Sequence, residues 1–242
     1  MAAVRSHAFV AVFAALGVCS IAGSIRLVHA EPAEVDRGDA RIEHEGATRE
    51  ATRKRYVVAA IGDSLTDTRV GGGRYMAALA KRCPQSRFDA YGIGGQFTSD
   101  MRARFASDLF GAGKPEYTHV IVLGGVNDLL SGRVAVKSVA SQLEAMYTTA
   151  RARGLTTIAL TVPPWAYPDP PRDRARTVEL DRWILAQPVD RVVDITPLLE
   201  CGPQKLLCEG YRRMSGDGTH WNERGHERVA AAIWDAAMRD CE

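Results

Sequence analysis

The chain has 242 residues, of which 46% are hydrophobic, and its 31 basic residues nearly balance its 29 acidic ones. The apolar content is that of a globular protein and excludes a largely disordered chain. The small net charge of +2 gives no basis for binding nucleic acid or an anionic surface, so we expect neither as a partner.

Residues 1–30 have the pattern of a signal peptide. Arg5 precedes an almost uninterrupted apolar stretch over residues 8–24, and the small-residue spacing that ends at Ala30 predicts cleavage there. Two alternatives are an uncleaved membrane anchor, for which the stretch is barely long enough, and a lipid attached at Cys19. We therefore expect a secreted or periplasmic protein with no stable membrane span after cleavage.

Residues 31–55 alternate basic and acidic side chains, with Val35 and Ile42 as the only larger aliphatic residues. Such a segment cannot bury enough apolar surface to offset the entropy lost on ordering, so we expect a disordered charged linker. The rest of the chain, residues 56–242, is long enough for one domain with a sizeable core.

The domain begins with an apolar run over residues 56–61 that is bounded by glycine, and we predict a strand there. A helix is expected over residues 74–82, where apolar side chains recur on one face before Pro84 ends the helix. Residues 87–91 and 118–123 are predicted as the next two strands, the second again followed by glycine. Continuous apolar runs of this kind are typical of parallel strands that are covered on both faces.

The second half of the domain continues the alternation. Apolar residues recur every three or four positions over residues 134–153, which predicts a helix that ends at Gly154. The remaining predicted elements are a strand at residues 156–162, a helix at 172–186, a strand at 191–195 and a last helix after the N-capping residue Asn222.

Five strands that alternate with helices predict an α/β fold, a three-layer α/β/α sandwich around a mainly parallel sheet with right-handed crossovers. Ligands of such sheets bind beyond the carboxyl ends of the strands. Candidate functional residues should therefore stand just after predicted strands.

Ser64 stands directly after the first predicted strand, so its hydroxyl should lie at the carboxyl edge of the sheet. A serine hydroxyl is a weak nucleophile unless a base takes its proton. His220 can be that base and Asp217 the carboxylate that orients it, since the two lie three residues apart on one predicted turn. Separately these residues could belong to a loop, a turn and a helix cap, but together they predict an acyl-transfer site.

Acyl transfer also needs hydrogen-bond donors at the oxygen that becomes negative. Gly94 and Gly95 follow the second predicted strand, where glycine would allow a backbone N–H to approach the nucleophile closely. Asn127 follows the third strand and offers the N–H groups of its carboxamide. Each segment, taken singly, could also be an ordinary turn.

Four short motifs resemble, in order, the conserved blocks of the SGNH hydrolases, also called GDSL esterases and lipases. They are Gly62-Asp63-Ser64-Leu65, Gly94-Gly95, Gly125-Val126-Asn127-Asp128 and Asp217-Gly218-Thr219-His220. The resemblance spans nearly the whole domain and implies the flavodoxin-like fold of that family and a site without cofactor or metal. The Gly-x-Ser-x-Gly motif of the α/β-hydrolases is absent around Ser64, which disfavours that other fold.

The resemblance assigns a role to each matching residue. It implies that Ser64 is the nucleophile, that His220 is the general base and that Asp217 orients the base. The oxyanion hole would consist of the Ser64 N–H, the Gly95 N–H and the side chain of Asn127.

One block departs from the family pattern. The glycine of the second block is often followed by an acidic residue, whereas Gln96 follows here. The adjacent Gly94 also leaves the register open by one residue, and Gly95 is the preferred oxyanion donor.

Two tryptophans are candidate substrate-binding residues. Trp165 lies in a proline-rich segment after the fourth strand, at the same edge as the motifs, where it could line an acyl or sugar subsite or simply pack a rigid loop. Trp221 could be a wall of the pocket or a core residue beside the last helix.

Four cysteines follow the signal peptide, and an even number in an exported chain favours disulfides. Cys201 and Cys208 are close enough in sequence to meet locally. Cys83 ends the helix after the first strand and Cys241 ends the last helix, and these two helices should pack side by side and run the same way. We therefore predict the pairs Cys83–Cys241 and Cys201–Cys208. A zinc site formed by Cys201, Cys208 and His220 is disfavoured, because these residues lack the paired short spacings of zinc ligands.

The sequence thus predicts an exported serine esterase that hydrolyses lipid, acyl or acetyl-carbohydrate esters through an acyl-enzyme. One alternative is an acyltransferase that acts on carbohydrate hydroxyls instead of water. A second is a non-catalytic carbohydrate-binding or surface module with the same fold, against which the intact set of Ser64, Asn127, Asp217 and His220 argues. In each case the expected ligand is a small molecule or a glycan.

Overall fold

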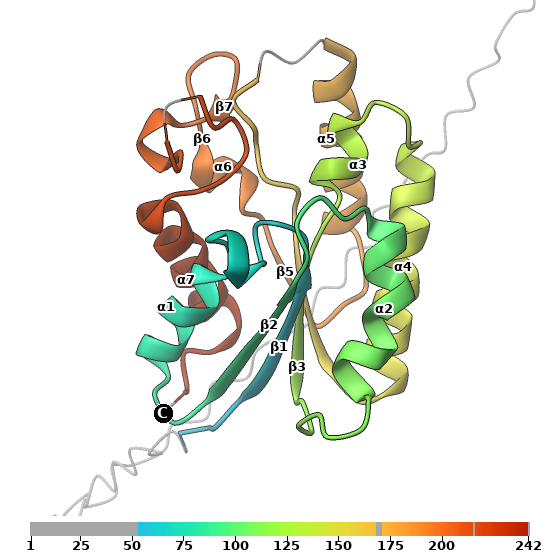
Figure 1. Ribbon diagram of the computed structural model, residues 1–242, viewed down its shortest axis with the longest axis vertical. Coiled ribbons are helices and arrows are strands. Elements are labelled where there is room, and N and C mark those ends of the chain that lie inside the picture. Colours follow the sequence, from blue (N-terminus) through green and yellow to red (C-terminus); the bar gives the residue numbers. More distant parts are fainter. Residues whose placement is uncertain (1–52, 168–170, 215, 242) are drawn as a thin grey trace, which may run out of the picture. The chain divides into compact units, whose positions relative to one another are not determined.

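The computed structural model describes residues 53–167, 171–214 and 216–241 of the chain (Figure 1). The predicted signal peptide and the linker up to residue 52 lie outside this part. Within it, none of the helices combines the length and apolarity that crossing a membrane requires.

Among the described residues, five parallel strands form the central sheet, in the order β2-β1-β3-β4-β5. The strands are β1 (Val57–Gly62), β2 (Arg87–Gly92), β3 (His119–Leu123), β4 (Thr156–Leu160) and β5 (Arg191–Val193). Each predicted strand is confirmed, because its observed bounds fall within the predicted range or one residue beyond it. Gly62 pairs with Gly92 on one side and with Leu123 on the other, so the first three strands end level with one another.

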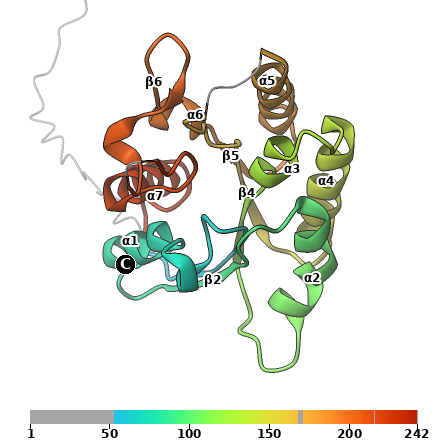
Figure 2. The same ribbon diagram turned by 45° about the horizontal axis from the view of Figure 1, so that its top comes forward.

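Helices cover both faces of the sheet, which confirms the three-layer fold (Figures 1 and 2). Helices α1 and α7 lie on one face, and α2, α4 and α5 lie on the other. The helices are α1 (Arg74–Arg82), α2 (Thr98–Phe110), α3 (Val126–Leu130), α4 (Val136–Ala152), α5 (Pro171–Leu185), α6 (Thr196–Leu199) and α7 (Glu223–Ala237). A short antiparallel ribbon, β6 (Glu200–Cys201) and β7 (Leu206–Leu207), precedes α7.

The sequence patterns missed α2 and α3. A crossover between β2 and β3 had to exist, since parallel strands cannot be joined by a tight turn. Met101, Phe105 and Leu109 recur every four residues in α2 and are buried, so the segment did carry a helical pattern. Helix α3 has only five residues, too few for a periodic pattern to appear.

The two cysteine pairs are joined in the structure. The α-carbons of Cys83 and Cys241 lie 5.3 Å apart and those of Cys201 and Cys208 lie 5.2 Å apart, distances that suit disulfides. The first pair links the carboxyl ends of α1 and α7, which lie side by side in Figure 1. The second pair closes the β6–β7 ribbon.

Candidate active site

Ser64 lies in a tight turn that begins where β1 ends. The N–H groups of Thr66 and Asp67 both donate to the Asp63 carbonyl oxygen at 3.0 Å. The Leu65 N–H donates to the Asp63 carboxylate, also at 3.0 Å. These bonds fix the backbone on both sides of Ser64, which is largely buried, with 8% of the residue exposed.

The glycine run after the serine packs against this turn. A Cβ atom on Gly72 would lie 2.1 Å from the carbonyl oxygen of Ser64, so only glycine allows the two backbone segments to approach so closely. The run therefore supports the position of the serine.

Asp217 and His220 lie in the turn before α7. Oδ1 of Asp217 accepts hydrogen bonds from the N–H groups of Thr219 at 3.1 Å and His220 at 2.9 Å. His220 Nδ1 lies 3.0 Å from Oδ1 and 3.1 Å from Oδ2 of the same carboxylate. Burial alone would raise the pKa of Asp217, but the N–H groups of His220 and Thr219 and the charge of His220 hold it below its ordinary value. Asp217 is therefore an ionised carboxylate fixed against the imidazole.

The fold brings Ser64 to this pair across 156 residues of sequence, with Ser64 Oγ 2.9 Å from His220 Nε2. When Asp217 accepts a hydrogen bond from Nδ1–H, the imidazole keeps its proton on Nδ1 and Nε2 carries the lone pair that can accept the serine proton. Ser64, His220 and Asp217 thus form one row of hydrogen bonds at the carboxyl edge of the sheet.

Arg213 also contacts Asp217, a feature that the sequence patterns did not predict. Its Nη2 lies 2.9 Å from Asp217 Oδ2, and its Nη1 donates to the Val70 carbonyl oxygen at 2.8 Å. Arg213 thereby joins the turn that carries Asp217 to the segment after Ser64. The four-residue spacing between the arginine and the aspartate was the sequence signal for this ion pair.

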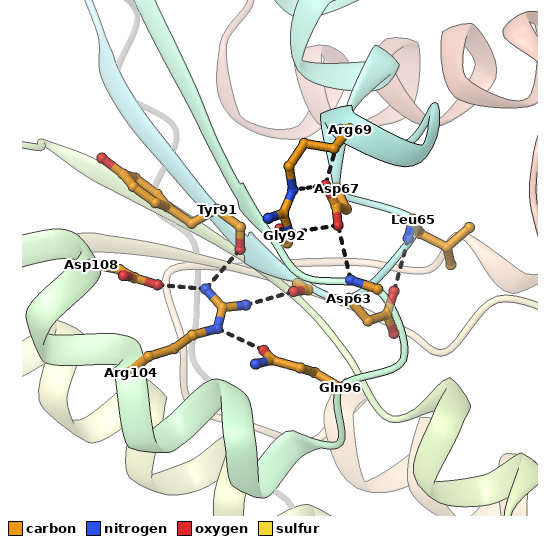
Figure 3. Close-up of polar contacts among 11 residues, drawn as sticks. Asp63, Leu65, Asp67, Arg69, Tyr91, Gly92, Gln96, Arg104 and Asp108 are labelled. Atoms are coloured by element: carbon orange, nitrogen blue, oxygen red, sulfur yellow. Dashed lines mark hydrogen bonds and ion pairs between the residues drawn. The ribbon is translucent and has the colours of Figure 1, made fainter.

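The structure distinguishes the two candidate oxyanion glycines. The Gly94 N–H donates to Asp67 Oδ2 at 3.0 Å, and Asp67 also binds Arg69 through both carboxylate oxygens (Figure 3). Gly95 adopts a φ of +78°, a conformation that favours glycine. No hydrogen bond of its N–H occurs among the described residues. Gly95 is therefore the glycine whose donor is available to a ligand.

Asn127 lies in the first turn of α3, directly beyond β3. Its Nδ2 donates to the Gln96 carbonyl oxygen at 2.9 Å, which places the amide beside Gly95. The neighbouring Asp128 is buried and accepts hydrogen bonds from Thr98 N–H at 3.0 Å and Thr98 Oγ1 at 2.9 Å. This pair of bonds joins the start of α2 to α3, so the segments that carry Gly95 and Asn127 are held together.

Both tryptophans belong to the core instead of to an open subsite. Trp165 is 3% exposed and Trp221 is 1% exposed. The Trp165 carbonyl oxygen accepts a hydrogen bond from Leu207 N–H at 3.2 Å, and the Trp221 ring lies edge-on to His226 with centroids 5.1 Å apart. The sequence allowed each tryptophan to be either a wall of a substrate subsite or a core residue. Their burial shows that both pack as core residues.

No cluster of histidine, cysteine, aspartate or glutamate that could hold a metal ion occurs in the described part of the chain. A hollow of about 580 Å³ lies at the opposite, amino ends of the strands, lined in part by Tyr56, His119 and Asp190. It shares no residue with the row of Ser64, His220 and Asp217.

Taken together, a parallel three-layer sandwich and a serine, a histidine and an aspartate in one row at its carboxyl edge define a hydrolase-type site. Residues 60–228 match the model of the GDSL-like Lipase/Acylhydrolase family, which is more than half of the chain, and the chain belongs to this family. It is accordingly a hydrolase that acts on esters. No curated protein matches the sequence.

Solved structures of similar fold include members of the same family. A GDSL-like lipase from Bacteroides thetaiotaomicron is 20% identical with a TM-score of 0.59, over 74% of this chain and 86% of that one. A lipase/acylhydrolase from Enterococcus faecalis is 19% identical with a TM-score of 0.58, over 74% and 93%. A catalytic mutant of an acetylxylan esterase from Geobacillus stearothermophilus is 18% identical with a TM-score of 0.59, over 74% and 93%. At these identities the likeness shows the fold.

Proposed function

We propose that the protein is an exported serine esterase that hydrolyses carboxylic esters through an acyl-enzyme on Ser64. The observation that carries the proposal is the continuous row from Ser64 Oγ to His220 Nε2 at 2.9 Å and from His220 Nδ1 to Asp217 at 3.0 Å. The signal peptide predicted for residues 1–30 and the paired cysteines support export.

In the first half of the reaction, Ser64 Oγ attacks the ester carbonyl carbon while His220 Nε2 takes the hydroxyl proton. The carbonyl oxygen becomes negative and accepts hydrogen bonds from the Ser64 N–H, the Gly95 N–H and Asn127 Nδ2. The intermediate then collapses, the bond to the alcohol oxygen breaks, and His220 gives its proton to that oxygen. The acyl group is left on Ser64.

In the second half, water replaces the alcohol. The water oxygen attacks the acyl carbon while His220 takes a proton from the water, and the same donors stabilise the oxyanion. Collapse breaks the bond to Ser64 Oγ, which regains the proton from His220, and the acid leaves. Asp217 keeps the imidazole in the required tautomer and stabilises it while it carries the extra proton.

The acyl and alcohol parts of the substrate are proposed only as a class, esters of lipids, acyl chains or acetylated carbohydrates. The acetylxylan esterase of similar fold supports including acetylated sugars, and the lipases of similar fold support including acyl chains. A panel of nitrophenyl esters of increasing chain length, measured beside acetylated xylan, would rank these substrates.

The test of the mechanism is Ser64→Ala, with Ser99→Ala as the matched control. Ser99 is an exposed serine in the first turn of α2, at the same edge of the sheet. We expect Ser64→Ala to lose several orders of magnitude in kcat and all labelling by a serine-directed fluorophosphonate, while the control keeps both. Activity above about a tenth of the parent in Ser64→Ala would contradict the proposal. Absence of labelling in the parent would favour a non-catalytic module.

A further inference from the structure

Arg104 is a largely buried arginine of α2 whose side chain contacts Tyr91, Gln96 and Asp108 (Figure 3). Its side chain is 13% exposed, and its Nη1 lies 2.5 Å from Asp108 Oδ2. The other contacts go to the strand ends. Nη2 donates to the Gly62 carbonyl oxygen at 2.8 Å, and Nη1 donates to the Tyr91 carbonyl oxygen at 3.1 Å. Nε donates to Gln96 Oε1 at 2.7 Å.

The acceptors of Arg104 belong to the segments that carry the reacting groups. Gly62 is the last residue of β1 and precedes Ser64 by two positions. The hydrogen bond from Arg104 Nη2 to the Gly62 carbonyl oxygen therefore fixes the backbone that leads into the turn of Ser64. Gln96 directly follows Gly95, and its carbonyl oxygen accepts the Asn127 amide at 2.9 Å. One guanidinium therefore links the nucleophile segment to both remaining oxyanion donors.

The segment around Gly95 depends on such side-chain contacts. Gly94 and Gly95 are exposed, and Gly95 has no neighbour within 4 Å of the position that a Cβ would occupy. Packing alone does not fix its N–H. Asp67 holds the segment from one side by accepting from Gly94 N–H at 3.0 Å, and Arg104 holds it from the other side through Gln96.

We propose that Arg104 is a positioning residue for the oxyanion hole, acting through Gln96 to place the Gly95 N–H and the Asn127 amide relative to Ser64. The inference rests on the proposed esterase function. An oxyanion donor stabilises the transition state only when it is already placed where the charge develops. Because displacement of about 1 Å can cost up to about a hundredfold in rate, loss of Arg104 should lower kcat more than it raises KM.

The experiment compares four variants in the full exported protein, with an activated nitrophenyl ester as the probe. Arg104→Met removes the donors, and Gln96→Leu removes the acceptor. Gln96→Glu keeps an acceptor for Arg104 Nε. Arg102→Met is the matched control, because Arg102 lies on the same helix and binds Gln142 at 2.9 Å in an exposed pair that touches no part of the site.

We expect Arg104→Met and Gln96→Leu each to lower kcat about tenfold or more, with KM changed less than about threefold. Gln96→Glu and Arg102→Met should stay within about twofold of the parent. The double variant Arg104→Met with Gln96→Leu should be no slower than Arg104→Met alone, because both changes remove the same contact. If Arg104 only stabilised the fold, its loss would lower the melting temperature. It would not lower kcat selectively over KM, and Gln96→Glu would not retain the activity that Gln96→Leu loses.

Gln96 keeps the test decisive where Arg104→Met does not fold, since its side chain is only partly buried. An unchanged kcat in Gln96→Leu, measured beside an inactive Ser64→Ala, would overturn the inference and leave the proposed function standing. Equal losses in Gln96→Leu and Gln96→Glu would also overturn it. Full activity in Ser64→Ala would overturn the proposed function and the inference with it.

Discussion

His226 makes the stability of this domain sensitive to acid in a way that can be measured. It lies on α7 and is 1% exposed, stacked on Tyr75 with ring centroids 6.1 Å apart and edge-on to Trp221 at 5.1 Å. Its Nδ1 is buried and has no hydrogen-bond partner among the described residues. Burial, with a smaller effect of the charges of Arg74 and His220, lowers the pKa of His226 to about 4.

The size and sign of the effect follow from this pKa. Well above pH 6.5 the imidazole is neutral in the folded and unfolded chains, so it contributes no pH dependence there. Between about pH 6.5 and 4 the unfolded chain binds a proton that the folded chain does not, so the free energy of unfolding falls as the pH falls. The shift of His226 from its ordinary value of 6.5 to about 4 corresponds to a total loss of about 3 kcal/mol, most of it complete by about pH 4.5.

The perturbation is His226→Phe, which keeps an aromatic ring in the stack and removes the titrating group. Urea unfolding followed by far-UV circular dichroism at about pH 7.5 and 4.5 gives the free energy of unfolding of each protein. On going to the lower pH, the parent should lose about 2.5 kcal/mol relative to His226→Phe. Tyr75→Phe is the control, since burial raises the pKa of Tyr75 and it does not titrate in this range. If the parent and His226→Phe differ by the same amount at both pH values, the reasoning is refuted.

Three further outcomes are expected. Asn127→Ala should lower kcat by about 10²–10³ with a smaller change in KM, and a loss confined to KM would make the amide a ground-state contact. Arg213→Met should lower kcat by less than about tenfold, because the arginine side chain is 37% exposed and solvent weakens its pair with Asp217, and a loss equal to that of Asp217→Asn would contradict this. Peptide mapping without reduction should find Cys83 joined to Cys241, and replacing both by alanine should cost a few kcal/mol of unfolding free energy, whereas free thiols would contradict the pairing.

The sheet and the place of Ser64 at its edge were predictable because their signals are local, whereas Asp217 and His220 follow no strand of the sheet and were indicated by their three-residue spacing and by the family motif. A continuous apolar run bounded by glycine identifies a buried parallel strand, and parallel strands bring their carboxyl ends to one edge. A residue that directly follows such a run is therefore placed by its sequence position alone. The same holds for Asn127, which stands just beyond β3.

The supporting residues were not predictable, because their partners are distant in sequence. Arg104 bonds carbonyl oxygens of Gly62 and Tyr91, and any residue type supplies such an oxygen. The choice between Gly94 and Gly95 likewise depended on Asp67, which lies 27 residues before Gly94. The Trp165 carbonyl oxygen accepts a hydrogen bond from Leu207 of the β6–β7 ribbon, which the apolar pattern did not show.

Both ends of the described domain lie at the amino ends of the strands (Figure 1). The Lys54 N–H donates to the Asp240 carbonyl oxygen at 2.7 Å, and Cys241 is joined to Cys83 close by. Ser64 stands at the carboxyl end of β1 instead. A purification tag, a fusion partner or a link to a solid support attached at either end of the described domain would therefore lie away from the edge that carries Ser64 and leave that edge uncovered.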